Sequence, residues 1–321
     1  MPISINSLKA RTFSKLGQRG SIFGMAIFDI VEETPILAVL TADLASLSGL
    51  DRFVAQHPDK FYNIGIAEQN MLGVAAGLCA EGYKPVLTTY ATFLSLRSCE
   101  QVRHYMGYMN LNMVLVGSGA GFAMGFSGNT HYSIEDLAVM RAIPNIVVLS
   151  PSDSTLAVKA FEAAIKIEKP VYIRLTGGLN CPMLYKEDFP YEIGKAIKIR
   201  DGADIQIIAT GIMVNRALQA AAMLEEKGIS AEVIDMHTIK PLDTSAIALS
   251  KKLIVTIEEH NIIGGLGGAV AEQLASKGAG VKLLRLGIQD QFLKSGDAEY
   301  LLEQCGLTPS LIAERILETL K

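Results

Sequence analysis

The chain has 321 residues, of which 50% are hydrophobic and 19% are charged. This length is typical of about two domains with sizeable cores, and the composition is that of a globular chain rather than a disordered one. Its 29 basic and 33 acidic residues give a net charge of −4. That balance argues against a basic surface for nucleic acid or for an anionic membrane.

The sequence offers no sign of membrane insertion, secretion or metal binding. No apolar run approaches the ~18 residues of a membrane span, and the N-terminal segment MPISINSLKARTFSK lacks the apolar core of a signal peptide. The four cysteines have no CxxC spacing, which argues against a disulfide framework or a zinc site; they are Cys79, Cys99, Cys181 and Cys305. We therefore expect a cytoplasmic protein with reduced thiols and no metal site of its own.

In the first half, short β-branched runs alternate with longer helical stretches, a pattern typical of a parallel α/β sheet. The predicted strands are Ile36–Leu40, Lys84–Thr88, Asn112–Gly117, Ile146–Leu149 and Val171–Leu175. The predicted helices are Ser21–Val31, Ala67–Ala80, Leu94–Met109, Ile134–Ala142 and Asp153–Ile167. Runs such as VVLS are apolar throughout, as expected of strands buried on both faces.

The composition changes at Gly177–Pro190, where Gly, Pro, Asn and charged residues follow no period. We therefore predict a first domain at 1–178, a linker at 179–190 and a second domain at 191–321, both doubly wound α/β. The second domain is predicted to contain strands Asp204–Ala209, Ala231–Asp235, Lys252–Ile257 and Val281–Arg285, and helices Met213–Glu226 and Gly267–Ser276.

Two glycine-rich segments stand out, at Gly117–Asn129 and Gly264–Val270. Neither fits GxGxxG or a Walker loop. The first follows a predicted strand, where open α/β sheets bind ligands, although it is also explained as a flexible connection. The second precedes a helix and could present amides to an anion, but close packing of the helix on the sheet is the favoured interpretation.

Longer motifs follow one another along nearly the whole chain: FYNIGIAEQNMLGVAAG from Phe61, TTYATFLSLRSCEQVRH from Thr88, GNTHYSIEDLAVMRAIPNIVVLSPSD from Gly128 and VYIRLTGG from Val171. Together they resemble the pyrimidine-binding domain of the transketolase family of thiamine-diphosphate enzymes. VIDMHTIKPLD from Val233 and TIEEHNIIGGLGGAVAE from Thr256 are similar to the family's C-terminal domain.

The GDG…N motif that binds the diphosphate and magnesium in this family is missing from the sequence. The resemblance therefore implies the C-terminal subunit of a split transketolase. An N-terminal transketolase subunit would supply the diphosphate and magnesium contacts. It also implies an α2β2 assembly, in which two copies of this chain pack about a two-fold axis.

Glu68, in IGIAEQN, is the predicted catalytic residue. The resemblance implies that its carboxyl group binds the aminopyrimidine ring of thiamine diphosphate and stabilises the imino form, which takes the proton that the thiazolium carbon must lose. A carboxyl group in a dry interface holds a proton more readily than one in water. Taken alone, Glu68 is also explained as an acid in the first turn of a helix, where the macrodipole favours it.

Further cofactor contacts are implied for Phe93, Tyr90 and Asp43. Phe93 lies in the family's aromatic segment, where a ring stacks on the aminopyrimidine; relatives often carry a second aromatic residue three positions later, and Leu96 stands there in this chain. Tyr90 is expected to line the same pocket. Asp43, in TADLA, matches an acidic residue near the thiazolium ring, and is also explained as a cap at the end of a strand.

For the substrate, the resemblance implies that Arg19 and Arg174 hold a sugar phosphate, which a guanidinium binds with a two-pronged fork. His131, in NTHYS, matches a family histidine near the donor hydroxyls and is predicted to be catalytic as well as substrate-binding. Each also has a plain alternative: a surface arginine, or a loop histidine in an ordinary hydrogen bond.

Three positions depart from the family pattern. Gly119 stands where relatives have a histidine that contacts the ketose C1 hydroxyl, and Phe126 and Ser127 stand where they have an acidic pair. These changes imply a less hydroxylated or differently shaped substrate. The partner chain, or a residue such as His104, is the alternative source of the lost contacts.

We therefore expect a thiamine-diphosphate-dependent transketolase subunit that moves a two-carbon ketol unit from a ketose or ketose phosphate to an aldehyde. One alternative uses a 2-oxo acid, as in subunits like deoxyxylulose-phosphate synthase or the β subunit of 2-oxo-acid dehydrogenases. Another is a catalytically silent paralogue that regulates a partner. Glu68 argues against the silent paralogue, because such a copy has no need of that acid.

Overall fold

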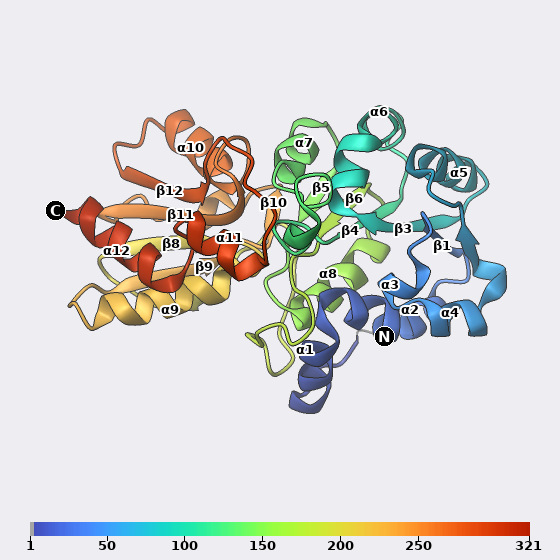
Figure 1. The fold of residues 1–321 in the computed structure, drawn as a ribbon, viewed down its shortest axis with the longest axis horizontal. Helices are drawn as coiled ribbons and strands as arrows, with labels where there is room; N and C mark the ends of the chain where they lie inside the picture. Colours follow the sequence, from blue (N-terminus) through green and yellow to red (C-terminus); the bar gives the residue numbers. More distant parts are fainter. Residues whose placement is uncertain (1–2) are drawn as a thin grey trace.

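The computed structural model describes residues 3–321. It contains two β-sheets that lie next to each other, each covered by helices (Figure 1). The first half supplies strands β1 (Leu37–Thr41), β2 (Phe61–Asn63), β3 (Lys84–Tyr90), β4 (Val114–Ser118), β5 (Val147–Leu149) and β6 (Val171–Arg174). The second half supplies β7 (Ile197–Arg200), β8 (Ile205–Ala209), β9 (Ala231–Asp235), β10 (Thr238–Lys240), β11 (Leu253–Asn261) and β12 (Lys282–Ile288).

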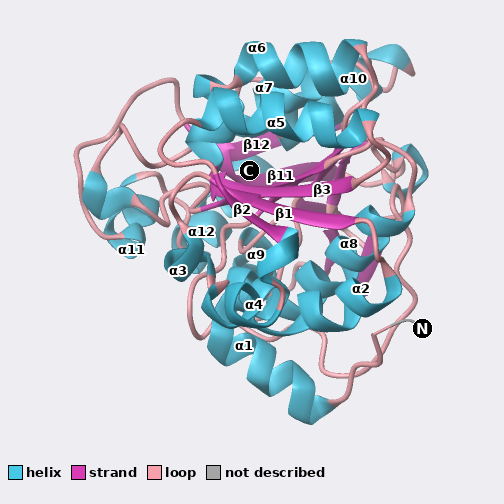
Figure 2. Cartoon of the chain, turned by 90° about the vertical axis from the view of Figure 1, so that its right-hand side faces the viewer, coloured by secondary structure: helices cyan, strands magenta, loops and turns pink. Residues whose placement is uncertain are grey.

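The helices cover both faces of the strands (Figure 2). In the first half they are α1 (Ser7–Ser21), α2 (Ile27–Glu33), α3 (Ala45–Ser48), α4 (Asp51–Gln56), α5 (Glu68–Ala80), α6 (Cys99–Gln101), α7 (Asp136–Ala142) and α8 (Ser154–Lys166). In the second half they are α9 (Met213–Glu225), α10 (Leu266–Ser276), α11 (Ala298–Gln304) and α12 (Pro309–Leu320). Three π-helical turns, η1 (Ile22–Ala26), η3 (Phe93–Arg97) and η4 (Val102–Tyr108), lengthen the helical segments of the first half.

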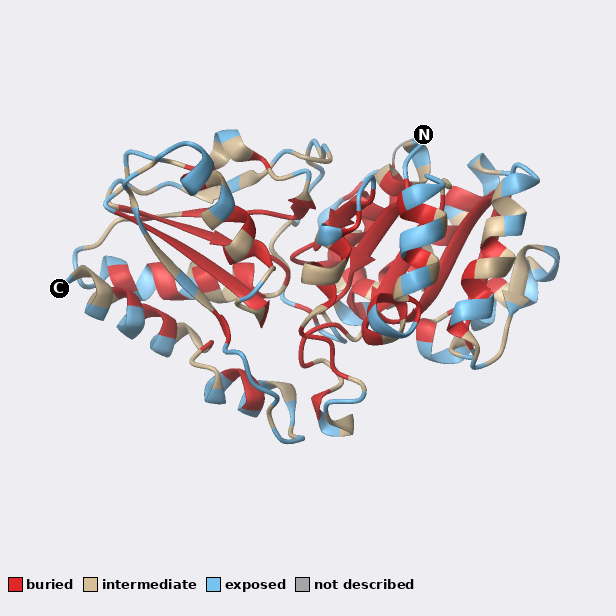
Figure 3. Ribbon diagram, turned by 90° about the horizontal axis from the view of Figure 1, so that it is seen from above, coloured by how far each residue is buried: buried red, intermediate tan, exposed pale blue. Residues whose placement is uncertain are grey.

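The strand order of the first sheet is β10-β5-β6-β4-β3-β1-β2, and that of the second is β12-β11-β8-β9-β7. All pairings are parallel except β10 with β5 and β7 with β9. Parallel sheets bury both faces beneath crossover helices, and the central strands are accordingly buried along their length (Figure 3). The prediction of two doubly wound α/β units is confirmed.

Strand β10 ties the two sheets together. It lies in the segment predicted to form the second domain, yet Thr238 and Lys240 pair with Leu149 and Val148 of the first sheet. One apolar cluster also continues from beneath the first sheet to Ile254 and to Leu266 of α10. The predicted linker 179–190 contains no helix or strand. It packs on the first half, where the amides of Leu184 and Tyr185 donate to the Asp153 carboxylate.

The structure differs from the prediction mainly at the edges of the sheets. Helix α1 and strands β2, β7 and β10 were not predicted; the strands have only three or four residues each, too few for a period to show. The helix predicted at Ser21–Val31 is the end of a longer helical segment that starts at Ser7 and passes through η1. The helix predicted at Leu94–Met109 is broken into η3, α6 and η4.

Candidate active site at the carboxyl edge of the first sheet

Most of the predicted site residues gather where the parallel strands of the first sheet end. Asp43 follows β1, Tyr90 is the last residue of β3, and Gly119 follows β4. Glu68 begins α5, five residues after the end of β2. Open α/β sheets bind ligands at this edge, so the fold brings residues that are distant in sequence to one ligand-binding surface.

Glu68 is a buried acid, with 2% of its surface exposed. Its Oε1 accepts a 2.8 Å charged hydrogen bond from Nη1 of Arg97. The Arg97 side chain is 47% exposed, and its Cζ lies 4.0 Å from the centre of the Phe93 ring. Arg97 was not among the predicted site residues, although it directly follows Leu96. The arginine therefore contacts both the carboxyl group and the ring that were predicted to receive the aminopyrimidine.

Three predicted residues form an aromatic cluster beside this pair. The ring centres of Tyr90 and Phe93 are 5.8 Å apart, those of Phe93 and His131 are 5.6 Å apart, and those of Tyr90 and His131 are 6.1 Å apart. All three contacts are edge-to-face, a favoured arrangement of aromatic rings. His131 Nδ1 is 2.9 Å from the Thr130 hydroxyl, so one ring nitrogen is occupied locally.

Arg19 lines a cavity of about 320 Å³ at the same edge. Ser48, Gly49, Ser118, Gly119, Met124, Gly177 and Gly178 are among the other lining residues. Arg19 is the one charged residue among the described residues that line it. Its Nη1 is 3.5 Å from Ser118 Oγ. Burial lowers the pKa of Arg19, and the nearby Tyr90 partly offsets this. A half-buried guanidinium in a small cavity is suited to an anionic group.

The three positions that depart from the family pattern have different surroundings. Gly119 has φ of +66°, and a Cβ atom there would lie 2.8 Å from Met124 Cγ and 3.2 Å from Tyr90 Cδ1. Met124 therefore fills the space of a side chain at 119. Phe126 is 69% exposed and is not part of the cavity wall. Met124, and not Phe126, thus gives the cavity an apolar wall, and Ser127 is half-buried in the same loop.

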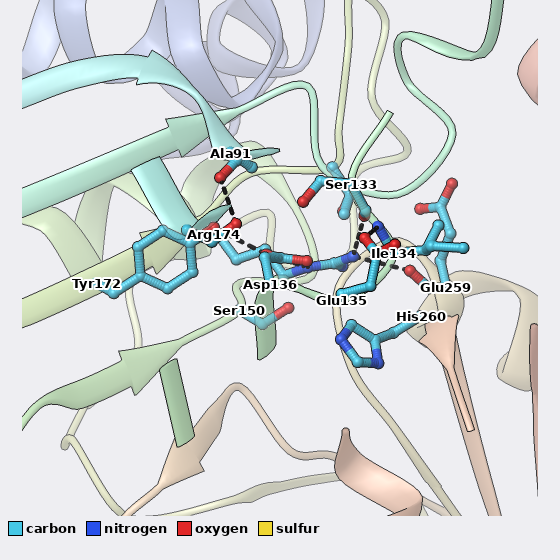
Figure 4. A network of polar contacts seen from close by, with 12 residues as sticks. Ala91, Ser133, Ile134, Glu135, Asp136, Ser150, Tyr172, Arg174, Glu259 and His260 are labelled. Atoms are coloured by element: carbon cyan, nitrogen blue, oxygen red, sulfur yellow. Dashed lines mark hydrogen bonds and ion pairs between the residues drawn. The ribbon is translucent and has the colours of Figure 1, made fainter. Parts of the chain in front are cut away.

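Arg174 lies within a buried polar network that includes Asp136 and Glu259 (Figure 4). It is 1% exposed, and its Nε lies 2.9 Å from Asp136 Oδ2. Its Nη2 donates to the backbone carbonyls of Ser133 and Glu259. Because the guanidinium is buried and bonds to Asp136 and to two backbone carbonyls, a phosphate has no access to it in the structure. Arg174 instead joins β6 to α7 and β11.

Asp43 and His104 lie apart from the aromatic cluster. Asp43 is exposed, with φ of +57°; its backbone N–H and its Oδ1 both bond to the Asn63 side chain, at 3.1 Å each. This pairing joins the ends of β1 and β2. His104 is exposed in η4, where its ring stacks on Tyr108 at 5.7 Å.

Two further findings concern the whole of the described chain, residues 3–321. No group of three or more His, Cys, Asp or Glu side chains lies close enough together to hold a metal ion. No helix there has both the length and the apolar character that crossing a membrane requires.

Both halves of the chain match domains of one known protein family. Residues 19–181 match the family described as "Transketolase, pyrimidine binding domain" and residues 194–312 match "Transketolase, C-terminal domain". The chain belongs to the transketolase family and is similar to the C-terminal part of a transketolase. Members of this family are thiamine-diphosphate enzymes, as the sequence motifs implied.

Several relatives are of similar length. The chain is 42% identical to a "Putative transketolase C-terminal section" of Methanocaldococcus jannaschii, over 93% of this chain and 95% of that protein. It is 40% identical to the 6-deoxy-6-sulfo-D-fructose transketolase subunit SqwH of a Clostridium species, over 88% of each. It also matches 1-deoxy-D-xylulose-5-phosphate synthase of Chlorobium luteolum at 39% identity, but spans 48% of that longer protein.

Comparison with solved structures agrees with the sequence comparisons. The chain superposes on a structure described as "Split gene transketolase, inactive beta4 tetramer" with a TM-score of 0.83 and 37% identity, covering 94% of this chain and 97% of that one. A Pichia stipitis transketolase in complex with sedoheptulose 7-phosphate shares the fold, with a TM-score of 0.74 and 24% identity, over 94% of this chain and 45% of that one. The resemblance to a split transketolase subunit is thereby confirmed.

Proposed function

We propose that this chain is the C-terminal subunit of a two-subunit transketolase that transfers a two-carbon ketol unit from a ketose donor to an aldehyde acceptor. The observation that carries the proposal is the buried Glu68 carboxyl at the start of α5 beside the ring of Phe93. A carboxyl and a ring together match the two needs of an aminopyrimidine, a hydrogen-bond partner for a ring nitrogen and a stacking surface.

The residues present fit thiamine diphosphate. Glu68 would hold the aminopyrimidine and keep a proton at its ring nitrogen, while Phe93 and Tyr90 would enclose the ring. When bound, the cofactor supplies a nucleophilic carbon that allows cleavage of the bond next to a ketone. His131 packs edge-on against both aromatic rings. At this end of the site it would orient a hydroxyl group of the donor or exchange a proton with it.

Arg19 marks where the far end of the donor would lie. Its guanidinium is half-buried and has a long contact with one serine hydroxyl, so its remaining N–H groups are free to bind an anionic tail. A phosphate and a sulfonate both present three oxygens to such a fork. One relative with 40% identity is named for a sulfo-sugar, 6-deoxy-6-sulfo-D-fructose, which makes a sulfonate a specific candidate for this chain.

A partner subunit is the second part of the proposal. Ile66, two residues before Glu68, is 78% exposed, and Leu96 is 46% exposed. Apolar side chains beside a buried acid favour a site that another chain covers. We propose an α2β2 assembly in which an N-terminal transketolase subunit supplies the diphosphate and magnesium contacts. One relative of known structure is described as an inactive tetramer of β subunits.

The test is reconstitution with an N-terminal transketolase subunit from the same organism, in the presence of thiamine diphosphate and magnesium. We expect an active complex with the mass of an α2β2 assembly, and aldehyde-dependent consumption of a ketose. The donor panel should include xylulose 5-phosphate, fructose 6-phosphate and 6-deoxy-6-sulfofructose. A complex that binds the cofactor but consumes no ketose would refute the proposal, and turnover of xylulose 5-phosphate at the rate of ordinary transketolases would refute the non-standard substrate.

A 2-oxo-acid donor is the second candidate, and Met124 favours it. The thioether side chain fills the space beside Gly119, where relatives place a polar contact to the ketose C1 hydroxyl. An apolar wall suits a methyl group better than a hydroxymethyl group, and the synthases that share 39% identity with this chain are named for a 1-deoxy product. Release of carbon dioxide from pyruvate by the reconstituted complex, without consumption of ketoses, would favour this candidate.

A further inference from the structure

The loop between β4 and α7 is closed at its base by the chain itself. Gly121 and Ser133 exchange two backbone hydrogen bonds, of 2.7 and 3.0 Å. Residues 121–133 therefore form a loop whose two ends lie side by side. Arg174, in the core of the first half, also donates to the Ser133 carbonyl. Apart from this base, the polar contacts that hold the loop to the rest of the chain come from the second half.

Three polar contacts join the loop to the second half. The N–H of Phe122 donates to Oε1 of Glu259 on β11, at 2.8 Å. The Tyr132 hydroxyl donates to the Leu293 carbonyl at 3.1 Å and lies 3.2 Å from the Leu293 N–H, from which it accepts. The Gly296 N–H donates to the Gly125 carbonyl at 3.1 Å. These anchors are spread along the loop, at its start, middle and end.

The apolar side chains of the loop belong to the core of the second half. Phe122 and Tyr132 are 0% and 1% exposed and stack edge-to-face at 5.4 Å. They are part of the cluster formed by strands β8, β9 and β11 with helices α9 and α12. Because buried rings contribute much of the cohesion of a core, the loop is fixed by the C-terminal half even though it starts from a strand of the first sheet.

Two glycines allow the loop to approach the second half closely. Gly121 has φ of +61°, and a Cβ atom there would lie 2.2 Å from Cδ of Glu259. A Cβ atom at Gly125 would lie 2.5 Å from a methyl carbon of Leu301 in α11. Side chains at these two positions would push the loop away from the second half. The glycine-rich composition of this segment thus serves contact between the halves.

The loop supplies two of the side chains of the candidate site. Met124 lines the Arg19 cavity, and His131 packs against Tyr90 and Phe93. We propose that the C-terminal half acts as the support of this loop, with Glu259 as its polar anchor and positioning residue, so that His131 and Met124 are presented to the donor. The use of these two side chains by a donor rests on the proposed function; the anchoring itself does not.

The neighbouring residue provides a matched control. Glu258 and Glu259 are adjacent on β11, 1% and 2% exposed, and each accepts backbone N–H groups. Glu258 accepts from Leu266 and Gly267 at the start of α10, within the second half. The two acids thus have the same chemistry and burial but anchor different segments, and Figure 4 shows Glu259 on the side of Ser133 and Ile134.

Hydrogen exchange of the full chain, in the absence of ligand, tests the anchoring. Glu259→Ala should raise the exchange rate of amides in 121–133 by about tenfold, since the buried hydrogen bond from Phe122 N–H to the Glu259 carboxyl group is lost. Glu259→Gln should restore protection, because its amide oxygen still accepts from Phe122. Glu258→Ala should raise exchange at Leu266 and Gly267 and leave the loop unchanged. Wild-type protection of the loop in Glu259→Ala, or equal loosening by Glu258→Ala, would overturn the proposal.

The positioning role has its own readout in the reconstituted complex. Glu259→Ala should raise KM for the donor about tenfold with a smaller change in kcat, Glu259→Gln should rescue most of it, and the affinity for thiamine diphosphate should stay at the wild-type value. If Glu259→Ala does not fold, Tyr132→Phe removes the Leu293 contacts while keeping the ring, with the same expected direction in loop exchange and donor KM.

An unchanged donor KM alongside a loosened loop would refute the positioning role. A wild-type complex that binds cofactor but turns over no donor would refute the proposed function, while the exchange data would still decide the anchoring.

Discussion

Two regions of the candidate site are built in different ways. The region around Glu68 takes its residues from a short stretch of chain, Glu68 to Arg97, and from one sheet. The loop 121–133 emerges from the same sheet, but Phe122 bonds to a carboxylate 137 positions away. The first region is therefore a local motif on a rigid edge, whereas the second depends on how the two halves of the chain pack.

In the proposed function, this contrast separates the residues that serve the cofactor from those that select the donor. A motif held by one sheet keeps its geometry when the rest of the chain changes, as a cofactor that all members share requires. A loop held by a second unit can be reshaped by changes in that unit alone, as specificity requires. Variants in the two regions should accordingly affect different measurements: cofactor activation in the first region, and donor KM in the second.

The largest effect is expected at Glu68. Glu68→Gln keeps the size of the side chain but cannot share a proton with the aminopyrimidine. Loss of a positioned acid–base group costs about 10²-fold or more in turnover, and hydrogen–deuterium exchange at C2 of the bound cofactor should slow with it. Glu100→Gln, at an exposed acid of α6, is the control and should leave both unchanged. C2 exchange at the wild-type rate in Glu68→Gln would contradict the assignment.

The anchor Glu259 should instead appear in the pH dependence of stability. Burial raises its pKa from an ordinary 4.5 to about 7, more than the nearby Arg174 lowers it. At a pH between these two pKa values, Glu259 holds a proton in the native chain and releases it in the unfolded chain. The contribution of Glu259 to the free energy of unfolding therefore falls as pH rises from about 4.5 through about 7. At about 1.4 kcal/mol per pKa unit, the change is roughly 3 kcal/mol.

Urea unfolding of wild type and Glu259→Gln between pH 4.5 and 8 measures this contribution as a difference. The difference is needed because burial lowers the pKa of His260 to about 4, which acts in the opposite direction below pH 6.5. Other groups that face Glu259 are Arg216, Asp136 and Cys305, and they are common to both proteins. A wild-type minus variant difference that does not change with pH would show that Glu259 is ionised throughout.

The sequence predicted the local region better than the loop. Glu68 stands in the motif that starts at Phe61, and Tyr90 and Phe93 stand in the motif that starts at Thr88. Strand β3, which ends at Tyr90, is long enough for its apolar run to be evident. Arg97 was missed because only the π-helical turn η3 brings its side chain over the Phe93 ring. The spacing of apolar residues in the sequence does not predict a π-helical turn.

Contacts between the halves explain the remaining differences. Arg174 was predicted to bind phosphate from its motif alone, but the carboxylate of Asp136 and the carbonyl of Glu259 surround it. Met124 fills the space beside Gly119 because the loop is folded against the second half. Strand β10 was missed because its three residues lie in the second half of the chain but pair with β5 of the first sheet. Tertiary packing of this kind leaves no local pattern in the chain.

Arg19 should affect donor binding more than the chemical step. Arg19→Met removes the one charged group among the described residues that line its cavity. A hydrogen bond to a charged partner contributes about 1.5–3 kcal/mol, so donor KM should rise by about tenfold or more with little change in kcat. Lys15→Met, at an exposed position of α1, is the control. Equal losses of kcat and kcat/KM in Arg19→Met would place this residue in the cofactor region rather than the donor region.

Arg97 is expected to give the smallest effect, on cofactor affinity. It contacts Glu68 at 2.8 Å and the Phe93 ring at 4.0 Å, so it competes with an aminopyrimidine for both. A half-exposed ion pair and an exposed cation–π contact together contribute about 1 kcal/mol. Arg97→Ala should therefore bind thiamine diphosphate about fivefold more tightly in calorimetry of the complex, and the gain should shrink at high salt.

Arg103→Ala is the matched control for Arg97, because Arg103 is 65% exposed and lies 4.0 Å from Glu100, away from the ring. A double-mutant cycle sharpens the result, since the gain from Arg97→Ala should become smaller in a Glu68→Gln background, where the ion pair is already lost. Weaker cofactor binding in Arg97→Ala would show that the arginine holds the cofactor rather than competing with it. An equal gain in both backgrounds would show that its contact with Phe93, and not its pairing with Glu68, is what the cofactor displaces.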